Sequence, residues 1–195
     1  KIKNYEIFAK KILKKIKKKP ISFEVFSDNL DEMKRQAEII NSWGKNVYVK
    51  IPITNTKKKS TAKLIKFLSN KNIKLNITAI MTINQVKEVL KNLNPRTKSY
   101  ISIFAGRIAD TGRDPVPVMR EALKLMKKNK KCELIWASTR EVYNILQAYE
   151  IKCHIITVTT DIIKKKNLYN YNLTKYSLDT VKAFRKDALK SNYKI

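Results

Sequence analysis

The stretch NVYVKIPITNTKKKSTAKLIKFLSNKNIKLNITAIMT, residues 46–82, decides the fold class because it alternates between two kinds of periodicity. Residues 46–54 and 74–82 are short apolar runs rich in β-branched side chains, which is typical of strands. Between them, residues 60–70 place apolar side chains at helical spacing. A strand, a helix and a second strand in this order predict a parallel pair joined by a right-handed crossover.

The same alternation continues on both sides of this stretch. Further strands are predicted at 21–27, 99–106, 132–138 and 153–159. Further helices are predicted at 4–18, 30–43, 83–93, 115–128, 140–149 and 177–190. Ser177 is expected to cap the last of these helices. Six strands that alternate with helices indicate an α/β fold, which we expect to form one domain over residues 1–195.

Two architectures fit this pattern, an open doubly wound sheet and a βα barrel. The chain contains only three glycines, Gly44, Gly106 and Gly112, so it has no glycine-rich loop for a phosphate group. Because a nucleotide-binding open sheet depends on such a loop, its absence favours the barrel. A barrel forms its site from side chains at the carboxyl ends of its strands.

The composition limits the classes of function. The net charge is +27, but 36 of the 43 basic residues are lysine and they are spread over the chain. Proteins that bind base edges or phosphate groups of nucleic acids favour arginine for these contacts, so nucleic acid is not the expected partner. No apolar run is long enough for a membrane span, and no apolar signal region lies near the start. Two cysteines and one histidine exclude a disulfide scaffold and a multi-histidine metal site within this chain.

Polar side chains interrupt the apolar strands at a few positions. They are Glu24, Lys50, Asn76, Thr78, Ser102, Ser138 and Arg140. Strand alternation places Asn76 and Thr78 on one face, and Ser138 and Arg140 likewise share a face. If these faces point into a barrel, the polar groups converge on its axis.

Lys50 and Glu24 carry the strongest chemical signal. A desolvated lysine is partly a neutral amine, which attacks carbonyl carbons and forms a Schiff base. Glu24 would then transfer protons, directly or through a water held by Thr78. The alternatives that remain open are a strand-end lysine that reaches back to water and a surface glutamate on an edge strand.

Two arginines, Arg107 and Arg140, each follow a predicted strand end. Together with Ser138 they would suit a phosphate group, since guanidinium groups form charge-assisted bidentate bonds with it. The alternative is surface ion pairing of these arginines with Asp110 or Glu141.

Six motifs in order along the chain resemble the transaldolase family, especially its short form that includes the fructose-6-phosphate aldolase-like enzymes. They are ISFEV (21–25), YVKIPIT (48–54), LNITAI (75–80), SIFAGRIAD (102–110), WASTR (136–140) and SLDTVKAFRKDALKS (177–191). The resemblance implies a TIM (β/α)8-type barrel of which about six of the eight βα units are present, without the first two strands. An aspartate and a Thr-Asn-Pro motif of those strands are not found in this sequence.

The resemblance also implies an activity: transfer of a dihydroxyacetone unit between sugar phosphates through a Schiff base on Lys50. Glu24 and Thr78 would hold the catalytic water, and Asn76 and Ser102 would orient substrate hydroxyls. The groups that would bind phosphate are Arg107, Ser138 and Arg140. No metal or organic cofactor would be needed, and the protein would be a cytoplasmic homo-oligomer.

Three alternatives stay open at this point, and one of them is that the truncated chain is inert, with two apolar strand edges exposed. An aldolase of the same family would release the three-carbon unit instead of transferring it. A non-catalytic basic binding protein, derived from the barrel, would bind nucleic acid with a steep dependence on salt.

Overall fold

The computed structural model describes residues 4–191 and residue 193. Contacts between residues divide the chain into two compact units, Lys1–Val158 and Thr159–Ile195. Whether residues 1–195 form one domain, as the sequence suggests, remains a prediction.

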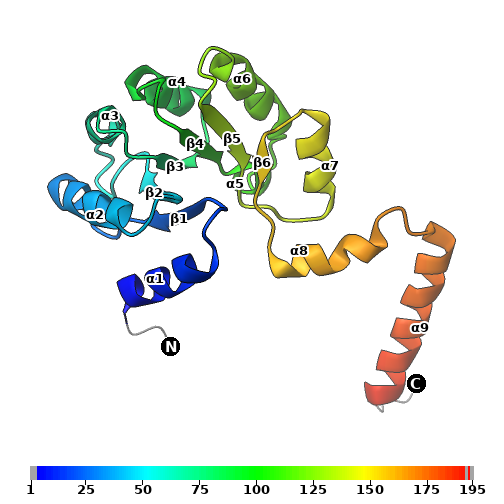
Figure 1. The fold of residues 1–195 in the computed structure, drawn as a ribbon. Helices are drawn as coiled ribbons and strands as arrows, with labels where there is room; N and C mark the ends of the chain where they lie inside the picture. The colour runs from blue at the N-terminus through cyan, green and yellow to red at the C-terminus, as the bar shows by residue number, and fades with distance from the viewer. Residues whose placement is uncertain (1–3, 192, 194–195) are drawn as a thin grey trace. The chain divides into compact units, whose positions relative to one another are not determined.

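One parallel sheet of six strands organises the first unit. The strands are β1 (Ile21–Glu24), β2 (Val47–Pro52), β3 (Leu75–Ile80), β4 (Ser99–Ile103), β5 (Cys132–Trp136) and β6 (Ile155–Ile156). They pair in chain order, each parallel to its neighbours, and the sheet curls as in part of a barrel (Figure 1). This confirms an α/β fold with about six βα units of a TIM-type barrel.

One helix precedes β1, and the other helices of this unit connect successive strands. They are α1 (Tyr5–Lys15), α2 (Leu30–Ser42), α3 (Ala62–Asn70), α4 (Ile83–Asn92), α5 (Ala105–Ala109), α6 (Val116–Met126) and α7 (Tyr143–Glu150). Figure 1 shows α2, α3, α4, α6 and α7 around the outside of the curled sheet. Local sequence starts three of them. Asn4 caps α1 and Asn29 caps α2, and a capping box of Thr82 and Gln85 opens α4.

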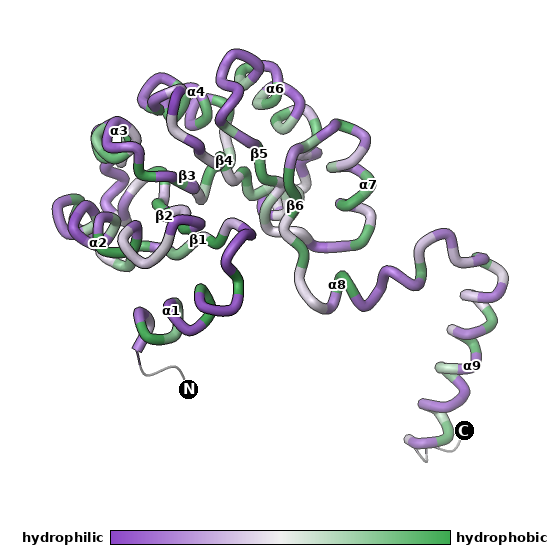
Figure 2. Tube along the Cα trace, viewed as in Figure 1, coloured by the Kyte–Doolittle hydropathy of each residue, from purple (hydrophilic) through white to green (hydrophobic). Residues whose placement is uncertain are grey.

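The two faces of the sheet differ in what covers them. Outward side chains such as Val49, Ile77 and Ile101 are fully buried in the main core beneath the helices. Along the helices themselves, hydrophilic and hydrophobic segments alternate (Figure 2). The inner face carries a smaller apolar cluster around Tyr48 and Tyr100, whose rings stack 4.1 Å apart. Beside this cluster, the inner face carries the polar side chains that the sequence singled out.

Several element boundaries differ from the sequence prediction. The strand predicted at 99–106 ends at Ile103, and Phe104 takes the N-cap position of the short helix α5, without a side-chain hydrogen bond to the helix. The helix predicted from Arg140 begins at Tyr143, since the Asn144 side chain accepts hydrogen bonds from the backbone N–H groups of Arg140 and Glu141. The last strand keeps only Ile155 and Ile156 of the predicted run.

The second unit contains α8 (Thr160–Lys164), a 3-10 helix η1 (Lys165–Leu168) and α9 (Leu173–Ser191). The helix predicted at 177–190 starts earlier, and Ser177 lies within it instead of capping it. The reason is Asn172, whose Oδ1 accepts a hydrogen bond of 3.0 Å from the backbone N–H of Lys175. In neither unit is any helix of the described residues both long and apolar enough to cross a bilayer.

Candidate active site

A hollow of about 700 Å³ lies on the inner face of the sheet. We call it the inner hollow. Six of the eight predicted site residues line it: Lys50, Asn76, Thr78, Ser102, Arg107 and Ser138. The other two, Glu24 and Arg140, do not line it. The curled sheet therefore brings together most of the polar positions that strand alternation selected.

Strand register explains why three of these side chains are neighbours. In the parallel pairing, Glu24 on β1 lies opposite Lys50 on β2, and Lys50 lies opposite Asn76 on β3. Residues that are level on adjacent parallel strands point to the same face of the sheet. The glutamate, the lysine and the asparagine thus form one row across three strands.

Lys50 and Glu24 form an ion pair, with 3.1 Å between Lys50 Nζ and Glu24 Oε2. The side chain of Lys50 is 30% exposed and that of Glu24 is 42% exposed, so both remain in contact with water. The pair leaves the amine at the rim of the inner hollow with a carboxylate within hydrogen-bond distance. This geometry suits proton exchange between the two groups.

Asn76 is held by two hydrogen bonds. Ser102 Oγ donates to Asn76 Oδ1 at 2.7 Å, and Asn76 Nδ2 donates to Ser22 Oγ at 2.9 Å. Asn76 and Ser102 are buried, whereas Ser22 is half-buried and also lines the inner hollow. Sequence reasoning missed Ser22, although it lies two residues before Glu24 and therefore on the same face of β1.

Thr78 is almost fully buried, and its Oγ1 has no hydrogen-bond partner among the described residues. It also borders the inner hollow. A buried hydroxyl without a partner costs about 1–3 kcal/mol, so such a group indicates a place for a water or a ligand atom.

A β-bulge follows Thr78 directly. Ile77 pairs with Ile101 but Ile80 pairs with Ile103, so β3 carries one extra residue between them. Ala79 lies in that interval at φ 60°, the left-handed region that side chains other than glycine rarely occupy. The extra residue lets Thr78 face the hollow while Ile80 stays fully buried in the main core.

The arginines lie at the ends of β4 and β5. Arg107 belongs to α5 and is exposed, with its guanidinium carbon 5.5 Å from the centre of the Phe104 ring. Arg140 pairs with Asp110, its Nε lying 3.0 and 3.1 Å from the two carboxylate oxygens. Hydrogen bonds from Arg140 hold the pKa of Asp110 below its ordinary value. Arg140 thus forms the ion pair that the sequence left open as an alternative to phosphate binding.

Gly106 is a further residue that sequence reasoning did not assign to the site. A Cβ at this position would lie 1.6 Å from the carbonyl oxygen of Ser138 and 3.1 Å from Arg140 Cγ. Only a residue without a side chain allows α5 to approach the end of β5 this closely. Ser138 itself has a φ of 65°, so the turn that follows β5 is tightly constrained.

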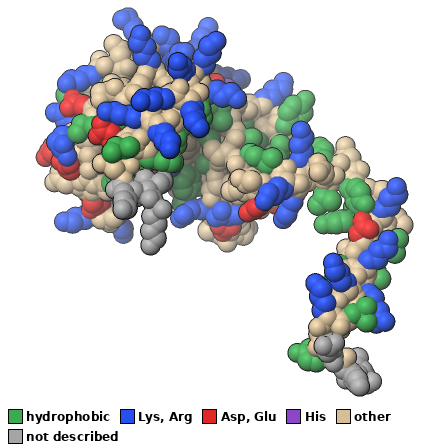
Figure 3. Space-filling view, turned by 60° about the horizontal axis from the view of Figure 1, so that its bottom comes forward, with side chains coloured by type: hydrophobic (Ala, Val, Ile, Leu, Met, Phe, Trp, Pro, Cys, Tyr) green, Lys and Arg blue, Asp and Glu red, His purple; other side chains and the backbone are tan. Residues whose placement is uncertain are grey.

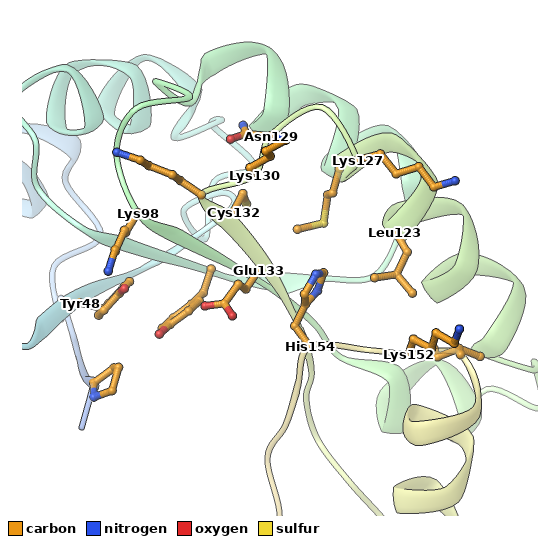
Figure 4. A pocket seen from close by; sticks show the side chains of 15 residues that line it. Tyr48, Lys98, Leu123, Lys127, Asn129, Lys130, Cys132, Glu133, Lys152 and His154 are labelled. Carbon is orange, nitrogen blue, oxygen red and sulfur yellow. The ribbon is translucent and has the colours of Figure 1, made fainter. Parts of the chain in front are cut away.

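A second hollow, of about 810 Å³, lies near the amino ends of the strands and contains none of the predicted site residues. Figure 4 shows Glu133 and His154 near its middle, while Lys98, Lys127 and Lys152 extend in different directions around it. His154 Nδ1 accepts a hydrogen bond of 3.1 Å from the backbone N–H of Leu134, which is a structural role. Lysines that do not converge on one point do not form an anion site.

The family relationship follows from comparison with known proteins. A model of the family described as Transaldolase/Fructose-6-phosphate aldolase matches residues 6–195. The chain is 33% identical over 156 residues to probable transaldolase 2 of Listeria monocytogenes, covering 80% of this chain and 67% of that protein. It is 32% identical over 156 residues to a probable transaldolase of Methanococcus maripaludis, covering 80% of this chain and 68% of that protein. A probable transaldolase of Thermoanaerobacter sp. is 30% identical over 177 residues, which cover 90% of this chain and 76% of that protein.

These matches agree with the six motifs in the sequence and with the parallel sheet of alternating strands and helices. Because the family model spans nearly the whole chain, the chain belongs to the transaldolase and fructose-6-phosphate aldolase family.

Proposed function

We propose that the protein transfers a three-carbon dihydroxyacetone unit from a ketose phosphate to an aldose phosphate through an imine on Lys50. The observation that carries this proposal is the Lys50–Glu24 pair, with the amine at the rim of the inner hollow and 3.1 Å from a carboxylate. The family relationship supports the same class of chemistry.

The first step is imine formation. Glu24 accepts a proton from the Lys50 ammonium, and the free amine attacks the keto carbon of the donor sugar. The resulting carbinolamine loses its hydroxyl as water, taking a proton from the carboxylic acid or from a water between the two groups. This leaves a protonated imine that draws electrons away from the neighbouring carbon–carbon bond.

The second step breaks the bond between carbons 3 and 4 of the donor. The proton of the carbon-4 hydroxyl passes to a base, for which we assign Glu24 acting through a water on Thr78 Oγ1. The electron pair of the broken bond moves to the imine nitrogen, which gives an enamine on Lys50. The aldehyde so formed leaves as an aldose phosphate.

The third step sets the type of reaction. Attack of the enamine on an acceptor aldehyde forms a new carbon–carbon bond, and hydrolysis of the imine then releases the new ketose phosphate. Protonation of the enamine by water, followed by hydrolysis, releases dihydroxyacetone instead and makes the enzyme an aldolase.

Substrate binding is assigned to two groups of residues. Asn76 and Ser102 offer buried polar groups for sugar hydroxyls. Arg107, Ser138 and Arg140 lie on neighbouring segments around Gly106 and would bind the phosphate group. Because Arg140 is paired with Asp110, its share in phosphate binding requires that phosphate compete with this carboxylate.

Reduction with borohydride in the presence of fructose 6-phosphate tests the proposal. Borohydride converts an imine to a stable secondary amine, so peptide mass mapping should find the added three-carbon group on the peptide that contains Lys50. Lys50→Ala should abolish both trapping and turnover while the fold is retained. Lys98→Ala, which changes a lysine of the second hollow, should leave both intact. An adduct on a peptide without Lys50 would refute the assignment.

Transfer and release are separated by one further assay. With an acceptor aldose phosphate present, a transaldolase forms a new ketose phosphate and little free dihydroxyacetone. An aldolase forms dihydroxyacetone at the same rate with or without the acceptor.

A further inference from the structure

We infer that Ser22 is a positioning residue for the reaction: its hydrogen bond fixes the orientation in which the Asn76 carboxamide contacts the substrate. This inference rests on the proposed function and deepens it. The motif ISFEV contains Ser22 but gave it no role; the hydrogen bond between Asn76 Nδ2 and Ser22 Oγ, 2.9 Å long, points to one.

The hydrogen bonds form a chain across the inner face. It runs from Ser102 on β4 to Asn76 on β3 and on to Ser22 on β1. The last step crosses over β2, where Lys50 lies level with Asn76 in the strand register. Ser22 and Asn76 therefore bridge the strand that carries the proposed nucleophile.

Two contacts on opposite ends of an amide restrict its rotation. Asn76 Oδ1 accepts from Ser102, and one of the two Nδ2 protons goes to Ser22. The second Nδ2 proton is left for a substrate hydroxyl, because Asn76 borders the inner hollow. Without Ser22, one end of the carboxamide would lose its anchor, and this proton would no longer have a fixed direction.

The position of Ser22 also fits this role. It is two residues from Glu24 on the same face of β1, and it lines the inner hollow itself. No acceptor for its hydroxyl proton is found within the described part of the chain, so this proton is available to the site.

Three variants test the inference. Ser22→Ala and Ser22→Cys remove the strong acceptor, whereas Ser22→Thr keeps it on a residue that suits a strand. Ser99→Ala is the matched control, because it removes the same hydroxyl from the helix-covered side of β4. Each variant is assayed for borohydride trapping on Lys50, for kcat and KM with fructose 6-phosphate, and for its urea midpoint.

The expected result separates imine formation on Lys50 from cleavage of the carbon–carbon bond. Ser22→Ala and Ser22→Cys should trap on Lys50 at nearly the wild-type rate but lose about tenfold in kcat, as expected for one hydrogen bond. Ser22→Thr should recover kcat to within about threefold, and Ser99→Ala should match the wild type. In a double-mutant cycle, Ser22→Ala should add little to the loss caused by Asn76→Ala.

Other results overturn the inference. Wild-type kcat in Ser22→Ala, failure of a folded Ser22→Thr to recover activity, or full additivity with Asn76→Ala would each remove Ser22 from the reaction while Lys50 trapping persists. Absence of a Lys50 adduct in the wild type would instead overturn the proposed function, and the role of Ser22 with it.

Discussion

Lys50 and Arg140 each lie beside a carboxylate, and their surroundings make the two pairs different. Arg140 is held on both Asp110 oxygens in an exposed, fork-like geometry. Lys50 contacts one oxygen of Glu24, and its ammonium can turn about a flexible stem. The first pair shows a guanidinium geometry that suits binding of an oxyanion, and the second pair suits proton exchange.

The assignment of Arg140 leads to a prediction about phosphate binding. Arg140→Ala should raise KM for fructose 6-phosphate about tenfold, since one charge-assisted contact is lost, while kcat changes little. Steady-state kinetics with fructose 6-phosphate and with unphosphorylated fructose should show the effect only for the phosphorylated sugar. Arg120→Ala, which changes an exposed arginine of α6, is the control. An unchanged KM in Arg140→Ala would remove this residue from the phosphate site.

Cys132 leads to a prediction about alkaline pH. Burial raises the pKa of its thiol from 9.0 to about 11. Above pH 9 the unfolded chain gives up this proton and the folded chain keeps it, so the free energy of unfolding falls as the pH rises toward 11. Between pH 8 and pH 11 the wild type should lose about 2 kcal/mol more than Cys132→Ala. Urea unfolding at both pH values measures this, and equal losses in the two proteins would contradict the prediction.

At the level of elements, the ends of β3 and β5 carry the irregular backbone of the site. Ala79 after Thr78 and Ser138 after β5 both have a positive φ without being glycine. Such residues cost of order 1 kcal/mol or more, and they persist where the surrounding packing holds them. For Ser138, helix α5 provides this packing, because Gly106 of α5 lies against the Ser138 backbone.

Gly106→Ala tests whether the contact between Gly106 and Ser138 shapes the proposed phosphate site. The new Cβ would force α5 and the Ser138 backbone apart, which should lower the free energy of unfolding by about 2 kcal/mol and raise KM for phosphorylated donors. Gly112→Ala is a matched control, since Gly112 has a φ of 75° but no atom within 4 Å of an added Cβ. It should cost about 1 kcal/mol in stability and leave KM unchanged. A normal KM in Gly106→Ala would show that this contact does not shape the phosphate site.

The order of elements was predictable, but several of their ends were not. Apolar periodicity placed all six strands and most helices, because burial on one side of the chain imposes that periodicity. The start of α9 at Leu173 depends on the Asn172 side chain, and the start of α7 depends on Asn144. Such choices between competing polar caps follow from local geometry, which periodicity does not contain.

On the scale of the whole chain, charge is the dominant property. The net charge is +27, and Figure 3 shows Lys and Arg side chains spread over the face in view instead of gathered in one stripe. Like charges at this density repel one another and oppose the compact state, and salt screens that repulsion.

The protein should therefore become more stable as salt is added. Between about 10 mM and 500 mM NaCl the free energy of unfolding should rise by about 1 kcal/mol, which corresponds to about 2–4 °C in Tm. Thermal unfolding followed by circular dichroism measures this. Sucrose, added to a similar osmolality, controls for effects that do not involve charge. A Tm that stays constant across the salt series would show that the lysines do not repel one another appreciably.

The sequence by itself determined the fold class and singled out Glu24, Lys50 and Asn76, because polar side chains within apolar strands stand out from the two-residue repeat. Strand register in the folded sheet then placed these three residues in one row. The family, with six motifs in order, was also present in the sequence. Only the tertiary structure decided that Arg140 pairs with Asp110, that Gly106 lies against Ser138, and that Ser22 holds Asn76. These contacts join residues 30 or more positions apart in the sequence. Sheet curvature, strand register and side-chain packing together determine which residues meet, and a local sequence pattern does not predict them.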